Sequence, residues 1–267
     1  MNDPFLTMTK EKHMLLALDV GNTNIVLGCF DGSKILFRER VSTNAQATDL
    51  EYATRIRMAL DIYHIGPGSI HAAIISSVVP GVTNTLRQAV KKYIGCDAMV
   101  VGPGIKTGLS ITIDNPAQLG SDLVVDAVAG IAEYSLPLII IDMGTATTLS
   151  VIDEKKRYRG GVIMTGAAVS MDALAGRAAQ LPKIAFEAPK HVIGTNTVDC
   201  MKSGLMIANA CALDGMIERI EEEIGAPCAV VATGGLASSI TPLCKREITL
   251  DDDLLLKGLY LIYQKNQ

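Results

Sequence analysis

Two short segments of the sequence place an aspartate beside glycine and uncharged hydroxyl or amide side chains. Residues 19–24 read Asp-Val-Gly-Asn-Thr-Asn, and residues 142–148 read Asp-Met-Gly-Thr-Ala-Thr-Thr. Glycine lets the backbone approach a ligand closely, and successive backbone N–H groups can bind an anion. Threonine and asparagine add uncharged donors, while an aspartate can hold hydrated Mg²⁺ or another cation. The composition favours a pair of phosphate-binding loops, although either segment alone could be an ordinary tight turn.

Both segments occupy the same kind of position in the chain. Each aspartate ends an apolar stretch, at residues 15–19 or 138–142, and a second apolar stretch follows at residues 25–30 or 147–152. Such stretches predict strands, and the intervening glycines predict hairpins. The two aspartates lie about half the chain length apart. This spacing indicates a duplicated unit and therefore two related lobes that face each other.

The elements that must position these loops alternate between strand and helix patterns. Thr48 and Glu51 predict a capping box at the start of a helix, and Pro137 ends the first unit. We expect a flexible N-terminal extension over residues 1–13, an N-terminal lobe over residues 14–136 and a C-terminal lobe over residues 137–267. Further strands are expected at residues 34–40, 70–75, 98–101, 110–113, 158–164 and 229–232, and further helices at residues 121–134, 167–180 and 197–224.

A third segment has the composition of an acceptor site. Residues 120–123 read Gly-Ser-Asp-Leu and open a predicted helix, so that Asp122 falls in the first turn, where the helix dipole favours a carboxylate. A kinase needs one carboxylate near the acceptor hydroxyl to orient it and take its proton. Asp122 is the candidate, and an ordinary helix-start aspartate is the alternative. Thr197 could donate to a substrate, although Asn196 and Thr197 together also suit a simple helix start.

Other nucleotide-binding patterns are absent from the sequence or weak. No GxxxxGK[ST] motif is present, and Gly102-Pro-Gly104 lacks the third glycine of the dinucleotide fingerprint. Residues 233–235 read Thr-Gly-Gly after a predicted strand. Such a turn could let a flat adenine or ribose lie against the backbone, but strand-to-helix turns often contain two glycines.

The composition and charge of the sequence exclude several kinds of binding partner and environment. The net charge is −4, and the longest basic run is Lys155-Lys156-Arg157, so we expect no nucleic-acid surface. The apolar runs have strand length and predict no membrane span. The six cysteines form no CxxC pair and favour reduced thiols. The first 13 residues lack the apolar core of a signal peptide, and we expect a cytoplasmic protein.

Taken together, these segments resemble those of type III pantothenate kinase, a family within the acetate and sugar kinase, Hsp70 and actin superfamily. The resemblance covers nearly the whole chain from Met14 onward. It implies an α/β fold of two duplicated ribonuclease H-like or actin-like lobes, each a mixed sheet flanked by helices, with the ligand cleft between them. The segments that carry it are residues 19–24, 102–108, 115–116, 120–122, 142–148, 160–161 and 194–197.

The resemblance implies ATP-dependent phosphorylation of pantothenate, the first step towards coenzyme A, by a homodimer. Asp122 would be the proton acceptor, Asp142 would bind a monovalent cation (K⁺ or NH₄⁺), and Asp19 would hold Mg²⁺ through water. The implied ATP-binding residues are Asp19, Val20, Gly21, Asn22, Thr23, Asn24, Ile25, Val26, Gly144 and Thr145. The implied substrate-binding residues are Gly120, Ser121, Asp122, Leu123 and Thr197.

One residue departs from the family pattern. The family usually carries Gly-x-Asp-Arg where this chain ends the motif in Leu123. An arginine there is expected to help hold an acidic substrate, and leucine has no side-chain donor. Either Arg177 or a cation of a partner chain compensates, or affinity for pantothenate is altered. Leu123 also leaves open a non-catalytic nucleotide-sensing regulator that binds protein partners, and a phosphohydrolase on the same fold is a second alternative.

Overall fold

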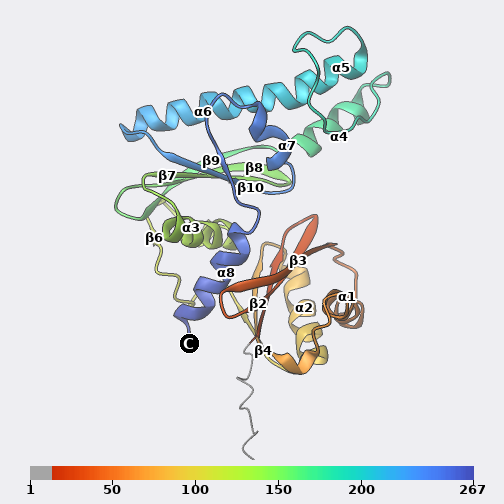
Figure 1. The fold of residues 1–267 in the computed structure, drawn as a ribbon, viewed down its shortest axis with the longest axis vertical. Coiled ribbons are helices and arrows are strands. Elements are labelled where there is room, and N and C mark those ends of the chain that lie inside the picture. Colours follow the sequence, from red (N-terminus) through yellow and green to blue (C-terminus); the bar gives the residue numbers. More distant parts are fainter. Residues whose placement is uncertain (1–13) are drawn as a thin grey trace, which may run out of the picture. The chain divides into compact units, whose positions relative to one another are not determined.

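The computed structural model describes residues 14–267, and the expected extension at residues 1–13 lies outside that part (Figure 1). The described chain forms two compact units. The first contains residues 14–105 with Asn266–Gln267, and the second contains Lys106–Lys265. Each unit is built on its own mixed β-sheet.

The first sheet has five strands in the order β3-β2-β1-β4-β5. Strands β1, β2 and β3 pair antiparallel, whereas β1, β4 and β5 run parallel. Every residue of β1 is buried, because strands flank it on both sides and apolar side chains cover its faces. The bounds are β1 Met14–Val20, β2 Asn24–Asp31, β3 Lys34–Ser42, β4 Ile70–Ser77 and β5 Ala98–Val100.

Two helices pack with this sheet, α1 (Asp49–Ile62) and α2 (Pro80–Tyr93). The predicted capping box at the start of α1 is confirmed, because the Thr48 side chain accepts from the Glu51 N–H and the Glu51 side chain accepts from the Thr48 N–H. A short 3-10 helix, η1 (Pro67–Ser69), leads into β4. Both helices pack against each other and contribute to one apolar core with β1, β2 and β4.

The second sheet repeats the same connection pattern. Its order is β11-β10-β7-β8-β9-β6, in which β7, β8 and β9 pair antiparallel while β7, β10 and β11 run parallel. The expected duplication is therefore confirmed strand by strand, with β6 as an added edge strand. The bounds are β6 Ser110–Ile111, β7 Leu138–Met143, β8 Ala146–Ile152, β9 Arg157–Thr165, β10 Ala229–Thr233 and β11 Thr249–Leu250.

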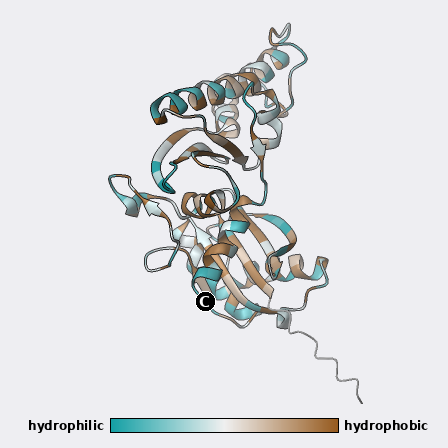
Figure 2. Ribbon diagram, turned by 60° about the vertical axis from the view of Figure 1, so that its left-hand side comes forward, coloured by the Kyte–Doolittle hydropathy of each residue, from teal (hydrophilic) through white to brown (hydrophobic). Residues whose placement is uncertain are grey.

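Helices cover both faces of the second sheet (Figure 1). Helices α3 and α8 pack on one face with Leu138 and Ile140 of β7, and α6 packs on the other with Ile139 and Ile141. The period of two along β7 produces this division. Figure 2 shows the strands as largely hydrophobic and α6 as a mixture of hydrophilic and hydrophobic turns. The bounds are α3 Ser121–Glu133, α4 Ala167–Arg177, α5 Thr197–Lys202, α6 Ala208–Ile224, α7 Ala237–Ile240 and α8 Leu254–Lys265. Short turns complete the unit as η2 Pro116–Gln118, η3 Ser203–Ile207 and η4 Thr241–Leu243.

Several element bounds differ from the sequence-based expectations. The helix expected over residues 197–224 contains a π-helical segment, η3, between α5 and α6. The strand expected over residues 110–113 is shorter, because only Ser110 and Ile111 pair with β9. The compact units divide between residues 105 and 106, since α3 packs against β7 and α8. The predicted lobe boundary between residues 136 and 137 stays a prediction.

Candidate functional site

The first aspartate-glycine segment forms the turn between β1 and β2. Val20 pairs with Ile25, and the Gly21 N–H donates to the Asn24 carbonyl at 3.0 Å. A Cβ on Gly21 would lie 3.2 Å from that carbonyl oxygen, so glycine suits this close turn. Thr43, just after β3, donates from its N–H to Thr23 and from its hydroxyl to the Gly21 carbonyl, at 2.9 and 2.7 Å. The turn is therefore held by its neighbouring strand.

The second segment forms the equivalent turn between β7 and β8. Met143 pairs with Thr147, and the Gly144 N–H donates to the Ala146 carbonyl at 3.0 Å. Gly144 and Thr145 are exposed at the tip, whereas Asp142 is half-buried at its base. The two turns thus share an aspartate one residue before the strand ends and an N–H contact across the turn. This arrangement can present backbone N–H groups to an anion.

Two further glycines let other segments approach the second turn. Gly234 follows β10 with φ +98°, and a Cβ there would lie 2.6 Å from both Asp142 Oδ1 and the Met143 nitrogen. Gly166 caps the start of α4, and its Cβ would overlap the Thr145 carbonyl. Side chains at either position would push the turn away. The Thr-Gly-Gly segment and the start of α4 therefore adjoin the turn that contains Asp142.

The Asp142 carboxylate and the Thr148 hydroxyl lie on the same face of the second sheet. Thr148 lies opposite Asp142 in the β7–β8 pair, and alternation places both side chains on the face covered by α3. The Thr148 hydroxyl is buried and makes no hydrogen bond within residues 14–267. A buried hydroxyl without a partner is uncommon, since it forfeits its hydrogen bonds to water. A carboxylate beside such a hydroxyl offers oxygen ligands that fit a cation with a preference for oxygen.

Asp122 lies in the first turn of α3, after the N-cap Gly120, as the sequence predicted. Its Oδ1 accepts from the Leu123 N–H at 2.8 Å. Burial raises the pKa of the Asp122 carboxyl above its ordinary value, and the N–H groups of Leu123 and of Asp122 itself lower it by less. A raised pKa makes this carboxylate a stronger base than a free aspartate, which suits proton transfer.

The packing of α3 brings Asp122 to the same end of the second sheet as Asp142. A Cβ on Gly130 would lie within 3 Å of the ends of the Leu138 and Ile140 side chains, so the middle of α3 sits over the start of β7. A short connection joins α3 to β7, and the helix therefore runs back along the strand. Its first turn reaches the end of β7 that carries Asp142, on the same face. The structure thus groups two predicted site residues.

Thr197 and Arg177 lie elsewhere in the second unit. Thr197 is exposed at the start of α5, and the predicted cap is confirmed because the Asn196 side chain accepts from the Asp199 N–H at 2.9 Å. Arg177 is exposed in the last turn of α4. Helix α4 joins the apolar core on the α6 face of the sheet, opposite to α3. Compensation for Leu123 by Arg177 stays a prediction.

Comparisons with known proteins identify the family. The model of the type III pantothenate kinase family matches residues 15–219. The chain belongs to the type III pantothenate kinase family. It is 45% identical over 254 residues to a type III pantothenate kinase of an Exiguobacterium species, a match that covers 95% of this chain and all of the relative. It is 44% identical over 253 residues to the type III pantothenate kinase of Halalkalibacterium halodurans, with the same coverage.

Solved structures agree on the fold of this pantothenate kinase family member. A conserved putative Baf family transcriptional activator from Campylobacter jejuni matches with a TM-score of 0.59 and 18% identity, over 94% of this chain and 98% of that one. A ROK hexokinase from Thermus thermophilus matches with a TM-score of 0.52 and 14% identity, over 95% and 99%. At these identities the matches show the duplicated actin-like α/β fold alone. No helix among residues 14–267 is long and apolar enough to cross a membrane.

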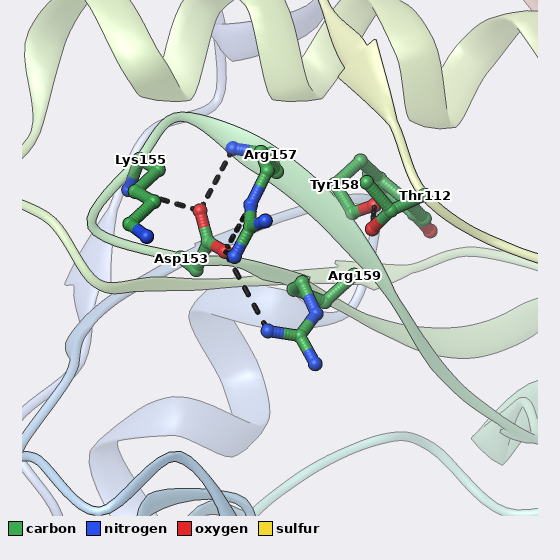
Figure 3. A network of polar contacts seen from close by, with 6 residues as sticks. All are labelled: Thr112, Asp153, Lys155, Arg157, Tyr158 and Arg159. Atoms are coloured by element: carbon green, nitrogen blue, oxygen red, sulfur yellow. Dashed lines mark hydrogen bonds and ion pairs between the residues drawn. The ribbon is translucent and has the colours of Figure 1, made fainter.

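Sequence reasoning missed a polar network that fixes β9 in this pantothenate kinase family member (Figure 3). The Asp153 carboxylate accepts from the N–H groups of Lys155 and Arg157 and from the Arg157 guanidinium, at 2.7–3.0 Å. Arg159 adds an ion pair to Asp153 at 3.6 Å. An aspartate just after a strand and two residues before a basic cluster could have signalled this turn.

The same strand carries Tyr158, which the sequence analysis also did not select. Its ring is buried, and its hydroxyl lies 3.0 Å from the Ser150 hydroxyl. Thr112 donates to the Tyr158 carbonyl from both its N–H and its hydroxyl, at 3.0 and 2.9 Å. No motif marks a buried tyrosine of this kind, because its partners Ser150 and Thr112 come from two separate segments of the chain.

Proposed function

We propose that this protein transfers the γ-phosphate of ATP to the primary hydroxyl of pantothenate, which yields 4′-phosphopantothenate and ADP, the first step of coenzyme A biosynthesis. The family match over residues 15–219 supports the reaction. One structural observation supports its location: Asp122 and Asp142 lie on one face and at one end of the second sheet. A base for the acceptor and a cation ligand for the donor would then be neighbours.

The two equivalent turns would bind the nucleotide. Residues 19–26 supply a backbone held by Thr43, and Gly144 and Thr145 supply an exposed turn tip in the second unit. Gly234, which has no side chain to shield the backbone, would lie against the ribose or adenine. Uncharged donors and backbone N–H groups suit a polyphosphate whose charge is neutralised by cations.

Cations complete this site. Asp142 and Thr148 present oxygen ligands that fit K⁺ or NH₄⁺, and the nearly buried Asp19 carboxylate fits Mg²⁺ held through water. Such ions supply charge neutralisation on the phosphates. The protein's own contribution is to fix these carboxylates at strand ends, where pairing on both sides limits their movement.

Asp122 would act as the base for the acceptor. As the pantothenate oxygen bonds to the γ-phosphorus, the bond from that phosphorus to the ADP oxygen breaks, and the hydroxyl proton passes to an Asp122 oxygen. The Leu123 N–H orients the carboxylate, and burial strengthens it as a base. Gly120, Ser121, Leu123 and Thr197 would contact pantothenate.

We propose a homodimer because of an exposed apolar surface around α4 and α5. Its side chains, all at least 40% exposed, are Val169, Leu174, Val192, Ile193 and Val198. Large exposed apolar surface commonly marks a protein interface. A partner would cover this surface and reach Thr197, which explains how a residue remote from Asp122 within its own chain could contact substrate. ATP as substrate and the free cysteines favour a cytoplasmic location.

A coupled assay of ADP release tests the proposed function. ADP should form only when ATP, Mg²⁺ and pantothenate are all present, and K⁺ or NH₄⁺ should increase its rate. Asp122→Asn should lower kcat about 100-fold or more, the usual scale for loss of a general base. Release of phosphate without pantothenate would instead indicate a phosphohydrolase. Tight ATP binding without turnover in K⁺, ATP and pantothenate would indicate a nucleotide-sensing regulator.

A further inference from the structure

Thr43, the first residue after β3, holds two carbonyl groups of the turn between β1 and β2. Its hydroxyl donates to the Gly21 carbonyl at 2.7 Å, and its N–H donates to the Thr23 carbonyl at 2.9 Å. Both carbonyls therefore point toward Thr43. Because a trans peptide unit is planar, each carbonyl and the N–H of the following residue point in opposite directions. The N–H groups of Asn22 and Asn24 are consequently directed away from Thr43.

Asn22 lies between these two anchored peptide units and is exposed at the tip of the turn. It makes no hydrogen bond to any of residues 14–267, whereas the neighbouring Gly21 N–H donates to the Asn24 carbonyl and closes the turn. A backbone N–H that has a fixed direction and is not used by the protein is the kind of donor that binds a phosphate oxygen. The hydrogen bonds of Thr43 thus prepare the turn for an anion.

Helix α1 holds the backbone on both sides of Thr43. The Tyr52 hydroxyl donates to the Asn44 carbonyl at 2.8 Å and accepts from the Asn44 N–H at 2.9 Å. On the other side, the Arg55 guanidinium donates to the Ser42 carbonyl at 2.9 Å. Thr43 is therefore flanked by two residues that are tied to the same helix, which limits its movement relative to the turn.

Tyr52 is itself fixed by burial in the core of the first unit. Its side chain is 1% exposed and shares an apolar cluster with Ile56 of α1 and Leu27 of β2. It directly follows Glu51, which closes the capping box at the start of α1. A buried phenol depends on its protein partners, because water cannot replace the hydrogen bonds that it would lose. The core of the unit therefore determines where Thr43 lies.

We propose that Thr43, held in place by Tyr52, is a positioning residue for the phosphates of ATP: it directs the backbone N–H of Asn22 toward the phosphate oxygens before the nucleotide binds. This inference rests on the proposed role of residues 19–26 in nucleotide binding. Because the turn already has its binding geometry, little conformational freedom is lost when the phosphates arrive. Thr43 touches neither pantothenate nor the reacting atoms in this scheme.

The test compares nucleotide binding by variants that keep the shape of a side chain and lose one hydroxyl. Thr43→Val should raise the Kd for Mg-ADP about three- to ten-fold, the scale of one neutral hydrogen bond, and leave the Kd for adenosine unchanged. Isothermal titration calorimetry measures both constants. Thr43→Ser keeps the hydroxyl and should keep the parent Kd for Mg-ADP.

Steady-state kinetics add a second readout. Thr43→Val should raise the KM for ATP by the same factor as the Kd, because the turn binds the nucleotide equally in the ground state and the transition state. The kcat and the KM for pantothenate should stay at the parent values. A general loss of structure would instead lower kcat, and that outcome overturns the proposal.

Tyr52→Phe tests the second half of the arrangement. It removes the phenol hydroxyl, keeps the buried ring, and should raise the Kd for Mg-ADP in the same direction as Thr43→Val. The double variant should show less than the product of the two single effects, because both act through the same turn. Should Thr43→Val fail to fold, Tyr52→Phe decides the proposal by the same comparison of Mg-ADP with adenosine.

Two matched control variants lose the same kind of group elsewhere in the first unit. Thr54→Val removes a hydroxyl that donates to the Leu50 carbonyl at 2.9 Å. Tyr63→Phe removes a phenol that donates to the Glu39 carboxylate at 2.7 Å. Both should leave the Kd for Mg-ADP unchanged. The proposal is overturned if the controls match Thr43→Val, if adenosine binding weakens as much as Mg-ADP binding, or if Thr43→Val keeps the parent Kd.

Failure of this inference can be told apart from failure of the proposed function. If the parent protein binds Mg-ADP no better than adenosine, neither turn binds phosphate and both proposals fall. If the parent protein binds Mg-ADP and phosphorylates pantothenate while Thr43→Val keeps the parent Kd, only the role of Thr43 falls. Urea unfolding of each variant establishes that folded proteins are being compared.

Discussion

Asp19 and Asp142 hold equivalent places in two sheets of the same strand order. Asp19 pairs with Val26 on its antiparallel neighbour and with Ser76 on its parallel neighbour. Asp142 pairs with Thr148 and Thr233 in the same two relationships. Each aspartate is the penultimate residue of its strand. The duplication thus preserves the position of a carboxylate at the base of a turn, although the turn sequences have diverged.

The pair formed by Asp142 and Thr148 leads to a prediction about cation dependence. Asp142→Asn should abolish the stimulation by K⁺ and lower the stimulated rate roughly ten-fold or more, because a charged ligand is lost. Thr148→Val should weaken K⁺ activation while leaving the free energy of unfolding unchanged or increased, since it removes a buried hydroxyl without a hydrogen-bond partner. Titration of the rate with KCl and urea unfolding check both. Unaltered K⁺ activation in Asp142→Asn would remove this residue as a ligand.

Gly234 should be required for the second turn. Gly234→Ala adds a Cβ 2.6 Å from Asp142 Oδ1 at a positive φ, and should raise the KM for ATP at least about ten-fold and cost about 2–3 kcal/mol of unfolding free energy. Gly225→Ala is the matched control, because Gly225 has φ +80° with no atom within 4 Å of the added Cβ. It should cost about 1 kcal/mol and leave the KM for ATP unchanged. Equal KM values for ATP in the two variants would contradict the steric argument.

Asp122 should lower the free energy of unfolding at neutral pH, although catalysis requires it. Burial raises its pKa, so the folded protein binds this proton more tightly than the unfolded chain does. The stability contribution is present below the unfolded pKa and is lost as pH rises through the folded pKa. At neutral pH, Asp122→Asn should therefore be more stable than the parent protein although it is nearly inactive. Urea unfolding at pH 7.5 and at acidic pH measures this, and a less stable Asn variant at neutral pH would argue against a buried ionised carboxylate.

Asp153 should contribute stability with the opposite pH dependence. Although burial opposes it, hydrogen bonds from Arg157 and the Lys155 N–H lower the pKa of Asp153, and their contribution should be lost as pH falls through the folded pKa. Asp153→Asn should cost about 1–3 kcal/mol, because the nearly buried carboxylate loses its charge-assisted hydrogen bonds to the partly exposed Arg157. Asp172→Asn, in an exposed ion pair with Lys183, should change stability by less than about 1 kcal/mol. Similar losses in the two variants, measured by urea unfolding at pH 7, would contradict this contrast.

Leu123 should limit affinity for the pantothenate carboxylate. Leu123→Arg restores a cation beside Asp122 and should lower the KM for pantothenate about ten-fold, the scale of one charge-assisted hydrogen bond. Leu123→Met keeps the side chain apolar and should leave that KM unchanged. Steady-state kinetics with pantothenate as the varied substrate make the comparison. A KM that rises in Leu123→Arg would show that another group already holds the carboxylate.

The sequence by itself determined the local features of this protein. Strand-ending aspartates followed by glycine predicted both turns, Thr48 and Glu51 predicted a helix start, and Asp122 was placed in a first helical turn. These succeed because turns, caps and strand periodicity depend on residues a few positions apart. The repeated Asp-x-Gly segments also predicted the duplication that the two sheets confirm.

Tertiary structure decided which distant residues lie together. It placed Asp122 and Asp142 at one end of a sheet face, whereas the start of α4 joins the core on the opposite face. It also selected Tyr158, whose partners Ser150 and Thr112 come from other strands or connections. Such groupings depend on how α3 and α4 pack on opposite faces of the second sheet. Packing of this kind follows from the burial of whole apolar faces, which no short sequence pattern specifies.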